Sequence, residues 1–348
     1  MVEYSPQHIP ASFPVTMKNK FKVFSQLFQQ KASTPPPVNG DRRVPLPPLP
    51  RRRGPGPLQR WRERGIHVTL FLAAASSIAV TLGIVGILGY ESLAFFREVS
   101  LWDFLTDPQW TPLFDDAHYG IMSLVAGTAT VAAVALSLAL PLGTITAIYL
   151  SEYAPHKVRE IVKPFLELLT AVPTVVFGYF ALLFVTPLLR HFIPSLPGFN
   201  MLSAGLVIGV MIIPYVSSLS EDAMRAVPMH LREASYSMGA TRFQTSVRVV
   251  FPAALSGVAS AYVLGFSRAI GETMVVAIAA GLQPNLTLNP LEPASTITAY
   301  IVQVSLGDLP HGSLSYQTIF AAGLTLMLMT LVFNIGGHLL RKQFREKY

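Results

Sequence analysis

The segment from Ile121 to Leu150 contains no charged residue, and this apolar run constrains the fold more than any other feature of the sequence. A helix needs roughly 20 apolar residues to cross about 30 Å of bilayer hydrocarbon. Several other segments also qualify, and they are apolar on all sides, whereas a surface helix of a soluble protein has a polar face. Only 13% of the residues are charged, compared with roughly a quarter in soluble domains. We therefore predict an all-α integral membrane protein, a polytopic bundle of about six transmembrane helices.

The apolar pattern also places the spans along the chain. They are expected near residues 66–89, 120–150, 164–187, 201–219, 253–281 and 317–340. The second and fifth are longer than a perpendicular crossing requires, so we expect them to tilt or to extend beyond the membrane. Within the fourth, Gly205 and Gly209 form a small-xxx-small pair that predicts close contact with a neighbouring helix.

Lysine and arginine alternate with these spans and indicate an orientation. Of the 26, twelve precede the first span, and the segments after the second, fourth and sixth spans hold three, four and four. The segments after the first and third spans hold only Arg97 and Arg190, and the segment after the fifth holds none. Because positively charged segments stay in the cytosol, both termini are expected to be cytoplasmic. We expect no nucleic-acid partner, since that would require the cations to gather on one folded face.

The first 65 residues are expected to form a disordered, Pro- and Arg-rich cytosolic tail, followed by a membrane domain over residues 66–348. Prolines cluster at 35–37 and 45–50, and proline at this density is incompatible with the interior of a helix or sheet. The segment Lys18–Lys31 has apolar residues at helical spacing opposite lysines. Two interpretations of it stay open: a helix lying on an anionic leaflet, or disordered chain with chance periodicity.

The loop between the fourth and fifth spans, residues 220–252, carries the most specific pattern in the sequence. Glu233-Ala234-Ser235 is followed after three residues by Gly239 and, after nine more, by Val249, Phe251 and Pro252. This spacing resembles the pattern E-A-A, three residues, G, nine residues, I-x-L-P, which marks the permease subunits of bacterial ABC importers. The three differences from that pattern are mild, and its glutamate, glycine and proline are all present.

A physical reason for this pattern lies in the shape that it predicts. Met229–Tyr236 can form a short helix along the membrane surface, and Gly239 then allows a sharp change of direction because glycine adopts positive φ without penalty. Pro252 suits the first turn of the fifth span. We expect a rigid helix–turn–helix that a cytosolic partner can grip; the plainer alternative is an ordinary amphipathic connector.

The chain lacks the sequence motifs of ATPases, of zinc-dependent proteases and of serine hydrolases. It contains no nucleotide-binding P-loop, no HExxH and no GxSxG sequence, and it has no cysteine. We therefore expect no catalytic residues, no metal ligands and no cofactor in this chain, which is not expected to be an enzyme. ATP and magnesium are expected to bind to a separate ATPase chain.

A charged pair interrupts the fifth apolar segment. Arg268 is expected near mid-membrane, where an arginine costs about 2.5–3.5 kcal/mol on insertion scales and is usually functional. Glu272 follows four residues later, which would place it on the same face of a continuous helix; Ser267 and Thr273 add polar groups. We interpret these four residues as a pathway for an oxyanion, since the planar guanidinium matches tetrahedral oxyanions. The alternative is a buried ion pair that only fixes helix packing.

From about residue 66 to its C-terminus, the chain resembles the PstC family of phosphate ABC transporter permeases. Four stretches carry the resemblance: Pro141–Pro155 (PLGTITAIYLSEYAP), Phe165–Leu182 (FLELLTAVPTVVFGYFAL), the Glu233 loop and Ser267–Val276 (SRAIGETMVV). The loop is shared by all permeases of this type, whereas the AVPTVVFG and RAIGET strings are narrower. The sister family PstA usually departs from RAIGETMVV.

The resemblance implies a type I ABC importer permease fold in the bacterial inner membrane and a role as half of a pathway for ATP-driven phosphate import. It implies a PstA-like permease, a dimer of PstB-like ATPases and an extracytoplasmic phosphate-binding protein as partners. The family's intramembrane Arg and Glu map onto Arg268 and Glu272, and its ATPase contact maps onto Glu233, Ala234 and Gly239. Two alternatives stay open, a permease for sulfate or molybdate and a secondary anion transporter.

Overall fold

The computed structural model describes residues 57–310 and 312–343, and this part of the chain is mostly helical. Five helical segments are long and apolar enough to cross a membrane: Trp61–Glu98, Met122–Tyr153, Thr174–Phe192, Met201–Arg225 and Leu314–Leu339. A sixth candidate is a broken pair, Arg242–Ala253 and Leu255–Ile270, whose halves are bent by 73°. The predicted helical membrane bundle is confirmed.

The element order begins with two N-terminal helices, α2 (Pro57–Glu98) and α3 (Leu101–Thr106). Because α2 begins at Pro57, the predicted disordered tail is wrong for its last residues, 57–65, which are helical. The boundary between the chain's two units falls within α2, after Leu70. Residues 1–56, including the segment Lys18–Lys31, lie outside the described residues.

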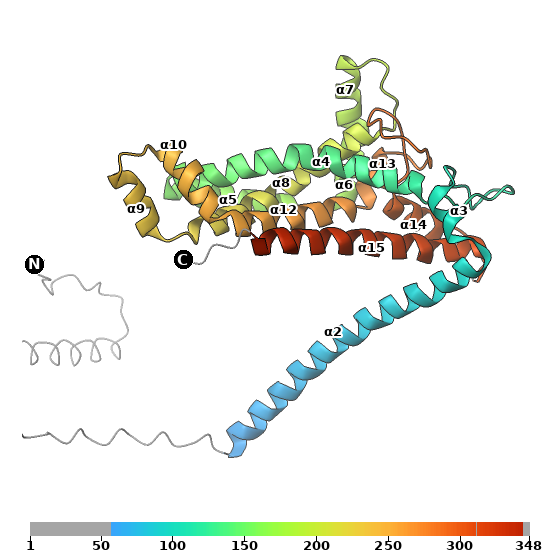
Figure 1. Ribbon diagram of the computed structural model, residues 1–348, viewed down its shortest axis with the longest axis horizontal. Coiled ribbons are helices and arrows are strands. Elements are labelled where there is room, and N and C mark those ends of the chain that lie inside the picture. Colours follow the sequence, from blue (N-terminus) through green and yellow to red (C-terminus); the bar gives the residue numbers. More distant parts are fainter. Residues whose placement is uncertain (1–56, 311, 344–348) are drawn as a thin grey trace, which may run out of the picture. The chain divides into compact units, whose positions relative to one another are not determined.

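The remaining helices follow in the order drawn in Figure 1. They are α4 (Met122–Ile148), α5 (His156–Thr170), α6 (Thr174–Phe180), α7 (Thr186–Phe192), α8 (Met201–Arg225), α9 (Met229–Ser237), α10 (Arg242–Thr245), α11 (Phe251–Ala253), α12 (Leu255–Ile270), α13 (Met274–Ala279), α14 (Ile297–Ser305) and α15 (Leu314–Gln343). Three π-helical segments, Tyr149–Tyr153, Ala181–Val185 and Ser246–Val250, continue α4, α6 and α10. The helices α9 and α10 lie at one end of the bundle and α3 lies at the other (Figure 1).

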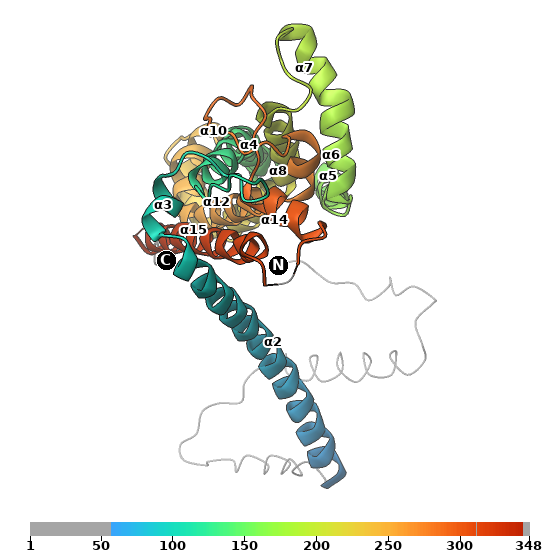
Figure 2. The same ribbon diagram turned by 90° about the vertical axis from the view of Figure 1, so that its right-hand side faces the viewer.

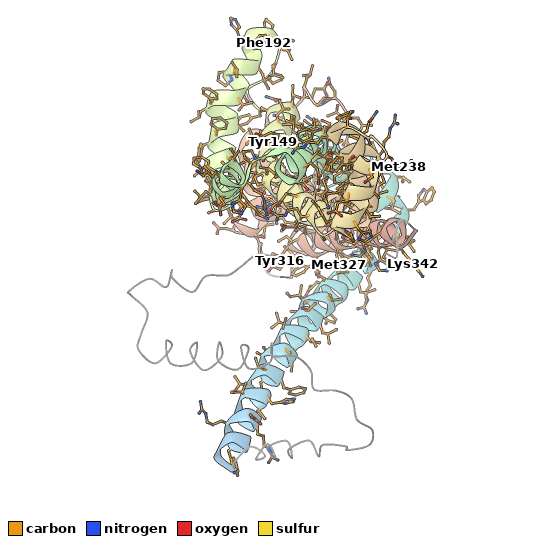
Figure 3. All side chains as sticks on the ribbon, turned by 90° about the vertical axis from the view of Figure 1, so that its left-hand side faces the viewer. Tyr149, Phe192, Met238, Tyr316, Met327 and Lys342 are labelled. Carbon is orange, nitrogen blue, oxygen red and sulfur yellow. The ribbon has the colours of Figure 1, made fainter. Side chains whose placement is uncertain are left out.

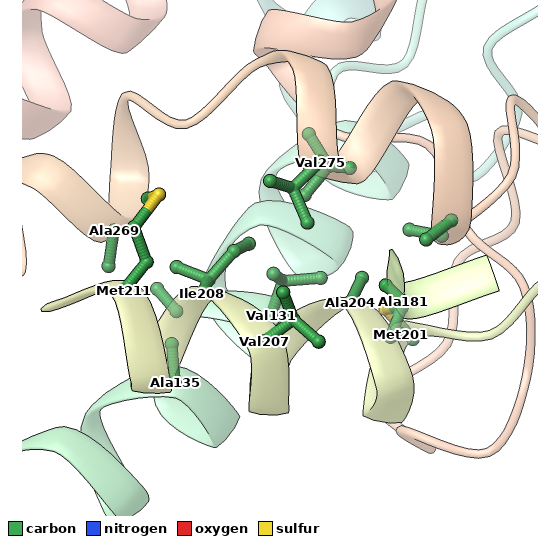
Figure 4. Close-up of a cluster of buried hydrophobic side chains, with 14 of the residues drawn as sticks. Val131, Ala135, Ala181, Met201, Ala204, Val207, Ile208, Met211, Ala269 and Val275 are labelled. Atoms are coloured by element: carbon green, nitrogen blue, oxygen red, sulfur yellow. The ribbon is translucent and has the colours of Figure 1, made fainter. Parts of the chain in front are cut away.

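The central contact of the bundle is between α4 and α8. Small residues allow their backbones to approach: a Cβ added to Gly205 would lie 2.7 Å from the Val134 Cβ, and one added to Gly209 would lie 2.8 Å from the Ala135 carbonyl oxygen. Figure 4 shows Val131 and Ala135 of α4 facing the buried side chains of α8. The predicted close packing at the glycine pair is confirmed, and van der Waals contact between small residues is what stabilises helix pairs in lipid.

The third predicted span, 164–187, is wrong in its boundaries because the chain bends before Thr174. The helix α5 ends at Thr170, and Pro173 precedes α6. Proline lacks an N–H group and keeps the preceding residue out of the α conformation, so one helix cannot continue through this point. The span is instead Thr174–Phe192, and α5, α6 and α7 follow one another along one side of the bundle (Figure 2).

The fifth predicted span, 253–281, is also interrupted. Its first helix, α12, ends at Ile270, and α13 begins only at Met274. The C-cap residue of α12 is Gly271, with φ of −83°. The break moves Glu272 out of the helix that carries Arg268, which changes the interpretation of this pair.

Candidate functional site

A pocket of about 340 Å³ opens beside the last turn of α12 and is lined by the two charged residues of the fifth predicted span. Its lining residues are Tyr215, Leu264, Ser267, Arg268, Gly271 and Glu272. Three of the four residues that the sequence places on a substrate pathway therefore lie together. The fourth, Thr273, is not part of the lining, and its hydroxyl donates to the Gly271 carbonyl oxygen at 3.2 Å.

Arg268 has no anionic partner in the described part of the chain. Its guanidinium carbon lies 4.7 Å from the centroid of the Tyr215 ring, a cation–π geometry. Its Nε atom is buried and makes no hydrogen bond with any described residue. A buried N–H group that lacks an acceptor is costly, so this partly exposed guanidinium offers an electrostatic attraction to an entering anion.

Glu272 lines the same pocket from the link between α12 and α13, and only 6% of its surface is exposed. Its Oε1 atom accepts a hydrogen bond from the Val275 N–H at 3.4 Å, and its backbone carbonyl accepts one from the Thr298 hydroxyl at 2.6 Å. The expectation that Glu272 shares a helix face with Arg268 is wrong. Because α12 stops at Ile270, the two residues line one pocket without forming an ion pair.

Two further residues of this region were missed by sequence reasoning. The Ser267 hydroxyl donates to Oδ1 of Asn334 on α15 at 3.1 Å, which links α12 to α15. Asn334 could have been found, because it is an amide side chain within a predicted span. Tyr215 had no such signal, since an aromatic residue within a long apolar helix is usually a packing residue.

The loop at the other end of the bundle has the predicted helix–turn–helix form. The helix α9 covers Met229–Ser237, and Gly239 follows with φ of +81°. An added Cβ at Gly239 would meet nothing within 4 Å, so glycine is needed there for its backbone conformation and not for space. Thr241 then starts α10 with a capping box to Gln244, which fixes the second helix at its first residue.

Pro252 does not occupy its predicted place in the first turn of the fifth span. It lies in the last turn of the helical segment Arg242–Ala253, and α12 begins at Leu255 after a bend of 73°. Proline removes a backbone donor and disfavours a straight helix. Pro252 therefore lies just before the bend instead of starting the span.

The tip of the loop is accessible to a partner. Glu233, Ala234 and Gly239 are all exposed. Met238 is 88% exposed and lies at the outer edge of the bundle (Figure 3), and Phe243 is 67% exposed. Large apolar side chains at such exposure are typical of an interaction surface when they gather at one place.

Arg232, next to Glu233, holds α9 to the bundle. Its guanidinium pairs with the Glu152 carboxylate, with Nη2 2.9 Å from Oε1, and these side chains are only 10% and 6% exposed. It also donates to the carbonyl oxygens of Met224 at 2.9 Å and Val227 at 2.6 Å, beside the end of α8. Sequence reasoning missed this pairing because 80 positions separate the two charges.

A second buried carboxylate joins α5 to α8. Glu221 is fully buried, with Oε1 2.8 Å from Nε of Arg159 and Oε2 2.9 Å from Nζ of Lys163. Lys163 also contacts Asp222 at 2.6 Å. No side chain of α5 is fully buried, so these ion pairs fix a helix that apolar packing alone would hold weakly.

Residues 139–346 match a protein family described as the binding-protein-dependent transport system inner membrane component. The chain belongs to this family. The match includes the pocket beside α12 and the loop at α9, whereas α2 precedes it. As a family member, the chain is a multi-pass inner-membrane transport subunit that works with a binding protein.

Individual relatives agree with the family match. The probable ABC transporter permease protein YqgH of Bacillus subtilis is 36% identical over 259 residues, which cover 74% of this chain and 83% of that protein. The phosphate transport system permease protein PstC of Mesorhizobium japonicum is 30% identical over 297 residues, covering 78% and 88%. The predicted resemblance to this group of permeases is confirmed.

Solved structures support the fold. A chain of a bacterial alginate ABC transporter, solved with an alginate pentasaccharide-bound periplasmic protein, superposes with a TM-score of 0.58. The superposition covers 83% of this chain and 99% of that chain at 16% identity. The expected fold of ABC importer permeases is therefore confirmed.

Proposed function

We propose that this chain is the permease subunit of an ATP-driven phosphate importer and forms half of its transmembrane pathway. Two observations support phosphate as the substrate. Relatives that match most of this chain, such as the one from Mesorhizobium japonicum, are named for phosphate transport. The observation that carries the proposal is Arg268, a cation without an anionic partner in a pocket of about 340 Å³.

The pocket has one group that attracts oxyanions and a second that distinguishes hydrogen phosphate from sulfate. A guanidinium offers a planar set of donors that matches two oxygens of a tetrahedral oxyanion, and Arg268 presents it beside Tyr215. The Glu272 carboxylate lines the same pocket and is an acceptor when ionised. Hydrogen phosphate carries a proton that it can donate to this carboxylate, whereas fully ionised sulfate has none. Arg268 would thus bind oxyanions in general, and Glu272 would favour the protonated one.

The movement driven by ATP hydrolysis would be transmitted to this chain through α9. We infer that the exposed tip, with Glu233, Met238 and Phe243, docks a dimer of PstB-like ATPases, which bind the ATP and magnesium. A PstA-like permease would complete the pathway, and a phosphate-binding protein would dock at the opposite end. The alternation of basic segments supports an orientation with α9 and both termini in the cytosol.

The substrate pathway is tested by phosphate uptake into vesicles containing the complete transporter. Arg268→Gln should lower uptake at low phosphate by roughly 10- to 100-fold, the value of a charge-assisted hydrogen bond. Arg97→Gln removes an exposed arginine at the end of α2 and should leave uptake unchanged. If Arg268→Gln protein assembles normally and transports at the wild-type rate, the proposed pathway is wrong.

The substrate class is tested by competition in the same vesicles. Arsenate, which also carries a proton near neutral pH, should inhibit phosphate uptake, whereas sulfate should not. Glu272→Gln should weaken this discrimination and allow sulfate to compete. Equal inhibition of the wild-type transporter by sulfate or molybdate would favour the alternative, a permease for another oxyanion.

The orientation is tested by labelling, which the chain makes simple because it has no cysteine. Ser237→Cys places a thiol on exposed α9, and Asp116→Cys places one at a side chain that is 99% exposed near the opposite end. A membrane-impermeant maleimide should label only the second in intact cells and the first after permeabilisation. The reverse pattern would contradict ATPase docking at α9.

A further inference from the structure

Two pockets lie along the groove between α12 and α15, two helices that pack against each other (Figure 1). One, of about 410 Å³, is apolar, with Val263 and Phe266 on the α12 side and Phe333 and Gly336 on the α15 side. Leu136 and Leu140 of α4 also line this first pocket. The other, of about 480 Å³, is lined by Ser256, His338, Arg341 and Lys342. Gly337 lines the first and His338 the second, so the groove changes from apolar to cationic within one residue of α15.

Glycine creates the apolar part of this groove. A Cβ added to Gly336 would meet nothing within 4 Å, so this position is open space on the surface of α15. The neighbouring Gly337 lies directly against the Val263 side chain, which brings α12 and α15 together. The rings of Phe266 and Phe333, with centroids 4.2 Å apart, add an apolar wall.

The cationic part lacks counter-ions within the described chain. Arg341 donates from Nη2 to Nδ1 of His338 at 2.8 Å, which orients its guanidinium without neutralising it. Neither Arg341 nor Lys342 forms an ion pair with a residue in the ranges that the structure describes. The Ser256 hydroxyl supplies a further donor. This set of groups matches a phosphate ester.

We propose that this groove binds one anionic phospholipid, with its phosphate group in the cationic pocket and an acyl chain along the apolar pocket. In the sequence of α15 the apolar residues give way to Arg341 and Lys342 at the cationic pocket, and this is the level at which a lipid changes from chain to head group. From Arg341 to Val332 the groove follows α15 for roughly 14 Å, close to half of the about 30 Å hydrocarbon thickness. An apolar helix of a second permease in this groove would leave the two cations unpaired, so the charges favour a lipid. The proposal does not depend on which anion is transported.

The test measures the thermal stability of the detergent-purified transporter complex with three additives. Phosphatidylglycerol should raise the melting temperature with a saturable dose dependence, phosphatidylcholine should raise it less, and glycerol 3-phosphate should have no effect at the same concentration. An equal effect of glycerol 3-phosphate would show a site for free anions and overturn the proposal. Equal effects of both lipids would overturn the assignment to the cationic pocket.

Matched variants locate the lipid. The double variant Arg341→Gln with Lys342→Gln should raise the phosphatidylglycerol concentration for half-maximal stabilisation by at least roughly 10-fold, since it removes two charge-assisted contacts. Gly336→Leu fills the apolar pocket and should have a similar effect, whereas Gly83→Leu adds the same side chain at another open position and should not. Each variant is compared with its own lipid-free melting temperature, so a change in folding is separated from a change in lipid response.

Two results from these variants would overturn the proposal. One is a wild-type response to phosphatidylglycerol in both the double variant and Gly336→Leu. The other is loss of the second permease from the Gly336→Leu complex while the lipid response stays normal, because the groove would then belong to a protein helix.

Discussion

The guanidinium carbon of Arg268 lies 4.7 Å from the centroid of the Tyr215 ring, and this contact joins α12 to α8. Nine residues after Tyr215, the Met224 carbonyl accepts a hydrogen bond from Arg232 of α9. These points are roughly 14 Å apart along one helix. The helix α8 therefore connects the loop at which force would enter to the pocket in which an anion would bind.

Tyr215 is expected to position Arg268 for an anion. Stacking occupies the face of the guanidinium and leaves its donor edge free, and such a contact is worth about 0.5–2 kcal/mol. Tyr215→Leu should therefore raise the KM for phosphate uptake by roughly 2- to 30-fold, with little change in the maximal rate. Tyr215→Phe keeps the ring and should stay close to wild type. A lower KM in Tyr215→Leu would show that the ring competes with the anion.

The pair between Arg232 and Glu152 is expected to hold α9 in place. Removing one partner of a buried pair typically costs about 3–5 kcal/mol because it leaves an uncompensated charge. Glu152→Gln should lower the melting temperature of the purified protein and reduce ATP-driven uptake. Glu160→Gln changes a carboxylate that is 65% exposed and should leave the melting temperature unchanged.

Exchanging the charges of Glu152 and Arg232 tests whether the loss of stability comes from their interaction or from the substitutions themselves. The double variant Glu152→Arg with Arg232→Glu should recover part of the stability that either reversal loses alone. Losses that simply add in the double variant would show that the two side chains do not stabilise one another.

The contact of α8 with α4 is expected to tolerate no larger residue at Gly205. An added Cβ would lie 2.7 Å from the Val134 Cβ, and forcing extra atoms into a packed contact costs about 1–3 kcal/mol. Gly205→Ala should therefore lower the melting temperature. Gly86→Ala, at a position where an added Cβ meets nothing within 4 Å, is the matched control. Equal melting temperatures for the two variants would contradict tight packing at Gly205.

The loop between α3 and α4 is expected to change stability with pH. A hydrogen bond of 2.8 Å from His118 to Asp107 raises the pKa of His118 above 6.5, and the Asp107 and Asp116 charges add to this. Because the folded pKa is the higher one, the stabilisation is complete below pH 6.5 and is lost as the pH rises through the raised pKa. For Asp107, burial opposes ionisation, but hydrogen bonds from the Gln109 N–H and His118 outweigh it and lower the pKa below 3.8. Its contribution is lost only in stronger acid, as the pH falls through that lowered pKa.

The measurement is the melting temperature of wild type and His118→Gln across this range. The difference between them should be largest in the window from above the Asp107 pKa to pH 6.5, and it should shrink at more alkaline pH. A difference that does not vary with pH would show that the imidazole charge has no role.

The conformation of a turn and the ends of a helix could be predicted from the sequence where they depend only on a few neighbouring residues. The conformation of Gly239 follows from its own lack of a side chain, and α9 ends within one residue of its predicted limit. One of the two wrong span boundaries has a local cause that was underweighted, Pro173, whereas the break after Ile270 has no such residue to account for it. The helix-breaking effect of Pro173 competes with the apolar character of the surrounding residues, and within a bundle either tendency can prevail.

The sequence by itself determined that the chain crosses the membrane several times and that the segment after the fourth span forms a helix–turn–helix at Gly239, and it singled out Arg268 as the charge within an apolar segment. These conclusions follow from short stretches of sequence. The free energy of placing a segment in lipid adds up over its own residues, and the conformation of a short turn depends on the few residues within it. Only the tertiary structure decided that Tyr215 stacks on Arg268, that Arg232 pairs with Glu152 and that Glu272 enters the pocket without an ion pair. Such contacts depend on how helices cross and where they break, and residues 80 positions apart carry no local signal of the pairing.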